Sequence, residues 1–160
     1  MINFNQLSLN KHGLTVAEVE KTYNLLLENY GLYHDIDIRE LKLDIDIIFV
    51  YKLFSTFVGK FRNDTVCKIF LNSAFLRNKE DLLKTLSHEL THYIQRTINV
   101  NNIYSDYNSN IEYELQPVEQ EAMAFSWITR GINKYEYDKY KETKVLYHKV
   151  NDKIRSKKSW

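Results

Sequence analysis

The segment from Lys79 to Ile98 contains neither glycine nor proline, and its leucines and isoleucines recur at helical spacing. Within it, the pattern H-E-x-x-H runs from His88 to His92. Residues four apart lie on one face of an α-helix, so both imidazoles can reach one metal ion, with Glu89 beside them. This pattern constrains the fold most, because it requires a long helix whose apolar face is packed and whose histidines line a cleft.

The residues around this segment predict where the helix begins and ends. Asn78 is a favourable N-cap, and Asp81 follows three residues later, as the acidic partner of a cap does. An asparagine-rich run follows Ile98 and predicts the end of the helix.

A catalytic zinc site usually has a third protein ligand, and a second predicted helix offers two carboxylates. This helix begins at Pro117 and stops near Gly131. Glu121 borders its apolar face, where burying an uncompensated carboxylate would be costly. Glu119 projects about 200° away, so both cannot reach one metal, and it also suits the start of a helix. We favour Glu121 as the third ligand and keep Glu119 as the alternative.

His88, His92 and a Glu-Ala pair at Glu121 on a second helix resemble the zincin metallopeptidases of the gluzincin kind, including small bacterial and phage zincins of the ImmA/IrrE type. The resemblance covers residues 65–131. It implies a minimal α+β fold, in which a small, mostly antiparallel sheet packs on the H-E-x-x-H helix and a second ligand-bearing helix. It also implies a Zn²⁺ site made by His88, His92 and Glu121, with Glu89 as the general base.

Tyr113 is a further candidate catalytic residue. It lies eight residues before Glu121, and related zincins often place a tyrosine shortly before the ligand glutamate. Such a hydroxyl can stabilise the oxyanion of the reaction. The alternative is that Tyr113 only packs, since this chain contains 12 tyrosines. The histidines outside the motif are interpreted as surface or structural residues and not as ligands: His12, His34 and His148.

The remainder of the N-terminal part predicts one helix and several strands. Residues 15–30 form a helix that begins with a capping box at Thr15 and Glu18 and ends at Gly31. Residues 36–38 and 41–50 alternate apolar and polar residues, as strands do. Residues 54–61 and 65–71 predict a hairpin, one strand of which is a candidate edge for binding an extended peptide.

The C-terminal residues differ in charge from the rest of the chain. Residues 1–131 are interpreted as the zincin-like domain, and residues 132–160 as a basic helical extension packed on it or trailing from it. The extension has nine Lys or Arg against four Asp or Glu. Its lysine-rich end at residues 153–158 could contact nucleic acid, or could be a solvated terminus. A net charge of +1 does not favour strong DNA binding.

Several classes of protein are disfavoured by composition. No apolar run reaches the ~18 residues that a membrane helix needs, and residues 1–5 lack the pattern of a secretory signal. A single cysteine, Cys67, excludes an internal disulfide and is interpreted as a small core residue. Together these features predict a cytoplasmic protein with no membrane partner.

The predicted activity is that of a zinc endopeptidase acting on a protein or peptide substrate, with Glu89 accepting a proton from water. Two alternatives remain open. One is a catalytically silent metal-binding protein that recognises peptides or regulates a partner. The other is a nucleic-acid-associated protease of the SprT-like kind that uses the basic extension. The substrate and the oligomeric state are not predicted.

Overall fold

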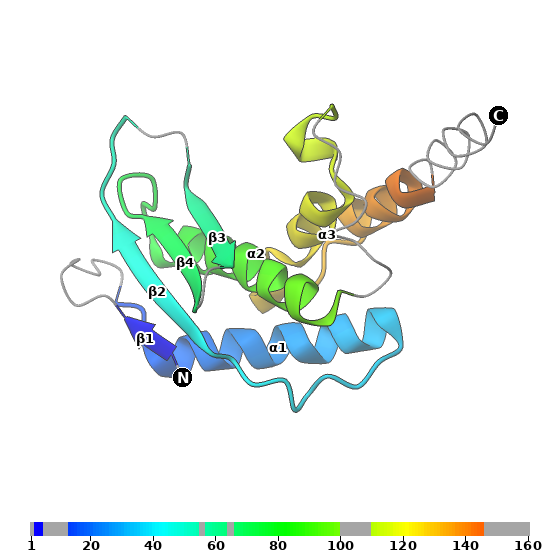
Figure 1. The fold of residues 1–160 in the computed structure, drawn as a ribbon, viewed down its shortest axis with the longest axis horizontal. Helices are drawn as coiled ribbons and strands as arrows, with labels where there is room; N and C mark the ends of the chain where they lie inside the picture. Colours follow the sequence, from blue (N-terminus) through cyan, green and yellow to red (C-terminus); the bar gives the residue numbers. More distant parts are fainter. Residues whose placement is uncertain (1, 5–12, 55–56, 64–65, 100–109, 146–160) are drawn as a thin grey trace.

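The computed structural model describes residues 2–4, 13–54, 57–63, 66–99 and 110–145, and it has the expected α+β architecture (Figure 1). A small sheet lies at one end, and the helices α1 and α2 extend beyond it. In chain order the elements are β1 (Ile2–Phe4), α1 (Val16–His34), β2 (Ile45–Val50), β3 (Gly59–Asn63), β4 (Cys67–Asn72), α2 (Lys79–Ile98), η2 (Tyr113–Leu115), α3 (Pro117–Phe125) and η3 (Ile128–Arg130).

The sheet is mixed and has the strand order β1-β2-β4-β3. β3 and β4 form the predicted antiparallel hairpin, with Phe61 opposite Ile69. The other two pairs, β1–β2 and β2–β4, are parallel, so the pairing differs from the mostly antiparallel sheet that we expected. The β1–β2 pair is parallel because α1 carries the chain from β1 back to the start of β2, and a helical crossover joins parallel strands. The β2–β4 pair is parallel because the chain reverses direction before β3 and again between β3 and β4. β4 then lies between β2 and β3, which places β3 at the edge.

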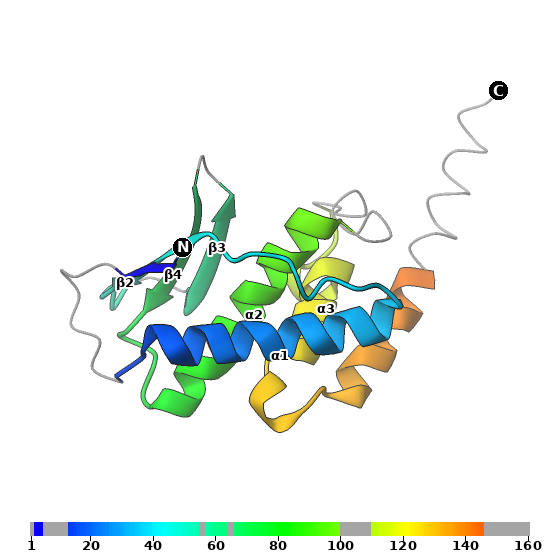
Figure 2. The ribbon, with the colours of Figure 1, turned by 90° about the horizontal axis from the view of Figure 1, so that it is seen from below.

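The core lies between the sheet and the two long helices, which pack on the same side of the sheet (Figure 2). Every second residue of β2 is buried, as the strand period of two requires. Most of the predicted apolar stripe of α2 is fully buried, with Leu83 only partly so, and each fully buried side chain contributes about 1.5–3 kcal/mol. This packing fixes the rotation of α2 and hence the direction of its histidines. The residues that line the core from β2, β4 and α2 include Ile45, Ile47, Phe49, Ile69, Leu71, Leu82, Leu86, Leu90 and Ile94.

Helix α1 begins as predicted but continues one turn further. The capping box is present, with the Glu18 amide donating to Thr15 Oγ1 at 3.2 Å and the Thr15 amide to Glu18 Oε2 at 3.1 Å. Gly31 lies inside the helix, which ends at His34 with Asp35 in the left-handed region (φ 52°). Gly31 is required by packing, because an added Cβ would lie 2.6 Å from the carbonyl oxygen of Ile36. The extra turn displaces the predicted strands, and residues 36–44 connect α1 to β2 without a strand.

Helix α2 has the predicted ends, whereas α3 begins as predicted but stops at Phe125, short of the end expected near Gly131. Asn78 Oδ1 accepts the Asp81 amide at 2.8 Å at the start of α2, and Asn99 closes its end in the left-handed region (φ 47°). Pro117 is the first residue of α3, as predicted, and the chain turns away through η3 to a positive-φ Gly131. All residues of α3 from 117 to 122 are buried, so carboxylates on more than one side of this helix need a partner.

The residues after Gly131 pack on the same core. Residues 134–145 are helical, and Tyr137 and Tyr140 are buried within the core cluster. The ring of Tyr137 lies edge-on to Tyr33 of α1, with centroids 4.4 Å apart. The lysine-rich end at residues 153–158 lies outside the described residues. No helix in the described part of the chain is long and apolar enough to cross a membrane.

Candidate metal centre

Three side chains from two helices converge on one point. His88 and His92 lie one turn apart on α2, and their Nε2 atoms are 3.2 Å apart. Glu119 of α3 places Oε2 3.0 Å from His88 Nε2 and Oε1 3.1 Å from His92 Nε2. The three donor atoms lie within 4.8 Å of one another. The predicted histidine pair is therefore brought together, and the alternative carboxylate completes the group.

Glu121 does not join the histidines, and the structure corrects the sequence interpretation here. Its carboxylate is fully buried on another side of α3. Oε1 accepts from the Tyr30 hydroxyl at 2.6 Å and from Gln95 Nε2 at 3.0 Å, and Oε2 lies 2.9 Å from His34 Nε2. The reasoning that a buried carboxylate needs compensation holds, but side chains of α1 and α2 supply the compensation for Glu121. The two carboxylates do point apart, as the helical spacing required.

The contacts of Tyr30 and His34 with Glu121 are what the sequence interpretation missed. The two residues lie four positions apart on α1 and so share one face of that helix. His34 was expected to be a surface or structural histidine. It proves structural, since its side chain is only 5% exposed and bonds to Glu121. The i, i+4 spacing of Tyr30 and His34 could have indicated that they share a face of α1. The residues near them in the sequence do not indicate that this face lies against α3. His12 and His148 lie outside the described residues.

Protonation in the cluster follows from its burial and its hydrogen bonds. Burial works to raise the pKa of Glu119, but the hydrogen bonds to His88 and His92 outweigh it and hold this pKa far below its usual range. Burial works to lower the pKa of His92, but its bonds to Glu119 raise it to about 9. Glu119 is therefore a carboxylate that attracts positive charge, whether a proton on His92 or a cation.

The donor set fits a zinc ion. Two imidazole nitrogens and one carboxylate oxygen are among the ligand sets of catalytic zinc sites, which keep a fourth position for water or substrate. These three atoms converge on one point, so a shared cation could take the place of the proton that now lies between them. His92 also has the outer partner that is typical of a ligating imidazole, because its Nδ1 lies 2.8 Å from Gln95 Oε1.

Glu89 lies beside the cluster between α2 and the edge strand β3. Its side chain is buried and only 6% of the residue is exposed. Burial raises its pKa, while the nearby imidazoles of His92 and His88 act in the opposite direction. A hydrogen bond from the Phe61 backbone in β3 also acts on the carboxylate. Glu89 thus lies beside the two histidines, and its role as a general base stays a prediction.

Gly59 allows this close contact between β3 and α2. A Cβ at this position would lie 3.0 Å from Glu89 Oε1 and would collide with Cγ2 of Thr85. Glycine is therefore needed so that the strand backbone can approach the carboxylate. The sequence interpretation did not single out this glycine, because its role appears only once β3 and α2 are placed side by side.

Tyr113 lies in η2, immediately before α3. The residue is 60% exposed. This position on the chain is the predicted one, just ahead of the carboxylate-bearing helix. A catalytic role for Tyr113 stays a prediction. Cys67, the single cysteine, is half-buried against the core, and burial raises the pKa of its thiol.

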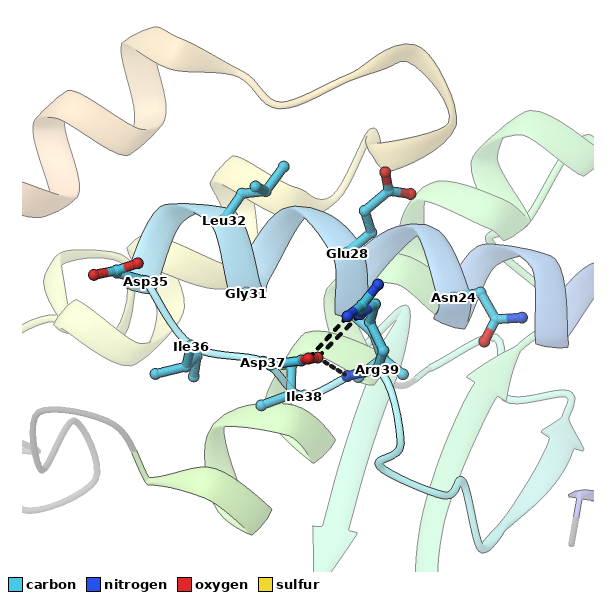
Figure 3. Close-up of a pocket in the computed structure, with 10 residues that line it drawn as sticks. Asn24, Glu28, Gly31, Leu32, Asp35, Ile36, Asp37, Ile38 and Arg39 are labelled. Atoms are coloured by element: carbon cyan, nitrogen blue, oxygen red, sulfur yellow. Dashed lines mark hydrogen bonds and ion pairs between the residues drawn. The ribbon is translucent and has the colours of Figure 1, made fainter.

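A hollow of about 830 Å³ lies elsewhere, between α1 and residues 35–39 (Figure 3). Two of its charged groups pair with each other, since Arg39 Nη2 donates to Asp37 Oδ2 at 2.9 Å and Arg39 Nε to Oδ1 at 3.0 Å. The hydrogen bonds from Arg39 lower the pKa of Asp37 to about 2. None of the residues that line this hollow belongs to the histidine cluster.

No family model, curated protein or solved structure matches this chain. A proposal for the function therefore starts from the geometry of the histidine cluster, with Glu89 and β3 beside it.

Proposed function

We propose that this chain is a zinc-dependent endopeptidase with a gluzincin-like site, in which His88, His92 and Glu119 hold the metal. The observation that carries this proposal is the convergence of the three donor atoms within 4.8 Å. Glu119 replaces Glu121 in the ligand set because only Glu119 contacts both histidines. When bound, zinc would supply a Lewis acid that lowers the pKa of a water and polarises a carbonyl.

Glu89 is proposed as the general base. Its position next to His88 places a carboxylate at the edge of the ligand group. Burial raises the pKa of this carboxylate, which favours its accepting a proton. Glu89 would take a proton from the attacking water and later give it to the nitrogen of the leaving amine. Hydrolysis of the amide bond then yields one carboxylate and one amine product.

The edge strand β3 is proposed as the binding site for the substrate backbone. Among the described strands, β3 has a neighbour on one side, β4, and is an edge strand on its other side. An extended peptide can pair with such an edge through its main chain. Its proximity to Glu89, which is close enough for a backbone hydrogen bond from Phe61, supports a scissile bond near the metal.

Metal analysis of purified protein, together with cleavage of a peptide library, tests the proposal. We expect about one zinc per chain in the wild type, loss of zinc in His88→Ala and Glu119→Gln, and retention in Glu121→Gln. Library cleavage should depend on the bound zinc. A wild type that binds no zinc, or a Glu119→Gln variant that binds it as tightly as the wild type, would overturn the site. Zinc binding without cleavage of any peptide would favour the catalytically silent alternative.

A further inference from the structure

Gln95 connects His92 to Glu121 beneath the metal ligands. Its side chain is fully buried. The amide nitrogen Nε2 donates to the Val118 carbonyl at 2.9 Å and to Glu121 Oε1 at 3.0 Å. The amide oxygen Oε1 lies 2.8 Å from Nδ1 of His92. The partners of Nε2 are therefore known acceptors, and they determine how the other end of the amide meets His92.

These contacts decide which ring nitrogen of His92 carries a proton. A backbone carbonyl and a carboxylate can only accept, so the NH₂ group of Gln95 must face Val118 and Glu121. Its oxygen must then face His92, and this oxygen can only accept. Nδ1 of His92 is therefore the donor, and Nε2 is the nitrogen that faces His88 and Glu119.

Glu121 is in turn held by α1. The Tyr30 hydroxyl and His34 Nε2 bond to its two oxygens at 2.6 Å and 2.9 Å. Tyr30 and Glu121 are fully buried, so water does not compete for these bonds. A continuous chain of hydrogen bonds thus runs from α1 through Glu121 and Gln95 to the ring of His92.

We propose that Gln95 and Glu121 are positioning residues that hold His92 with its Nδ1 protonated and its Nε2 lone pair directed at the metal. This inference rests on the proposed metal site. Outer-shell partners of a ligating histidine fix its tautomer and ring orientation, and removing them typically weakens metal binding. Glu121, which is not a metal ligand, would thus influence the orientation of His92 through Gln95.

The test compares Gln95→Leu with Gln120→Leu. Gln120 is also buried, and neither amide atom has a hydrogen-bond partner in the described part of the chain. We expect Gln95→Leu to weaken zinc affinity about 10- to 100-fold in competition with a chromophoric chelator, and Gln120→Leu to leave it near the wild-type value. Nitrogen-15 NMR of the metal-free protein above pH 9, where the His92 ring is neutral and carries one proton, should show that proton on Nδ1, and this signal should be lost in Gln95→Leu alone.

Two variants of Glu121 separate positioning from packing. Glu121→Gln keeps an acceptor for Gln95 and should keep both the proton signal and the zinc affinity. Glu121→Leu removes that acceptor and should weaken zinc binding. The inference is overturned if Gln95→Leu retains the Nδ1 proton signal or binds zinc as tightly as Gln120→Leu does. If the wild type binds no zinc, the proposed function fails, and the Nδ1 signal of the metal-free protein still decides the orientation of His92.

Discussion

Glu119 and Glu121 lie two positions apart on α3, yet their carboxylates contact different sets of side chains. Glu119 meets His88 and His92 of α2, whereas Glu121 meets Tyr30 and His34 of α1 and Gln95 of α2. Both are buried, so each needs its own partners. The short helix α3 therefore places one carboxylate in the proposed metal site and contacts α1 through the other.

Removal of Glu121 should destabilise the protein more than removal of a surface carboxylate. Glu121→Ala leaves Tyr30, His34 and Gln95 buried without their shared acceptor, which we expect to cost about 3–5 kcal/mol of unfolding free energy. Urea unfolding of the metal-free protein measures this cost. Glu114→Ala, at an exposed position in η2, is the control and should change stability by no more than about 0.5 kcal/mol. Equal effects of the two variants would contradict the buried network.

Replacement of the general base should separate binding from catalysis. Glu89→Gln keeps the size of the side chain but cannot accept the proton, so zinc stoichiometry should match the wild type while cleavage falls by about 10²- to 10⁴-fold. Hydrolysis of a fluorogenic peptide, paired with metal analysis of the same sample, provides the measurement. Glu20→Gln, exposed on α1, should cleave normally. Full activity of Glu89→Gln would remove Glu89 from the mechanism.

A methyl group at Gly59 should disturb the contact between β3 and Glu89. Gly59→Ala would place Cβ 3.0 Å from Glu89 Oε1 and against Cγ2 of Thr85. We expect a loss of about 1–3 kcal/mol of stability and a lower cleavage rate with zinc retained. Adding Thr85→Ser removes the colliding methyl and should recover stability, but not the rate, because the contact with Glu89 remains. Recovery of both would show that only packing was affected.

Zinc binding should release a proton from His92. The bonds to Glu119 raise the pKa of this residue to about 9 despite its burial, so at neutral pH a metal must displace a proton from the ring. The logarithm of zinc affinity should therefore rise by about one unit per pH unit from pH 7 and level off near pH 9. Chelator competition across this range is the measurement. An affinity that is independent of pH would mean that His92 is not a ligand.

Stability of the metal-free protein should fall as the pH rises. The folded pKa of His92, about 9, lies above its ordinary value of 6.5, so its contribution is fully present below pH 6.5 and lost towards pH 9. The loss should be at most about 3 kcal/mol, by the conversion of 1.36 kcal/mol per pKa unit. Urea unfolding at pH 6.5 and pH 9 measures it. The His92→Leu variant should show a smaller difference between the two values.

Local signals in the sequence determined the helical elements of the site. The capping residues Thr15 and Asn78, the uninterrupted apolar stripe of α2 and Pro117 each act within a few residues of where they stand, and the structure has the helix starts that they predict. The spacing of His88 and His92 likewise required only a helix to bring the rings together. Gly31 misled the interpretation, since it lies one turn before the end of α1 and its absent side chain makes room for the carbonyl of Ile36, where the chain turns back after the helix.

The tertiary structure alone decided which carboxylate meets the histidines. The sequence showed that Glu119 and Glu121 point apart on one helix, but the rotation of α3 depends on how α1 and α2 pack around it. Since α3 is buried on several sides, its apolar stripe did not indicate which side faces α2. The strand order β1-β2-β4-β3 and the contact of Gly59 with Glu89 likewise join residues far apart in the chain. Such contacts arise from packing of whole elements, which local spacing does not encode.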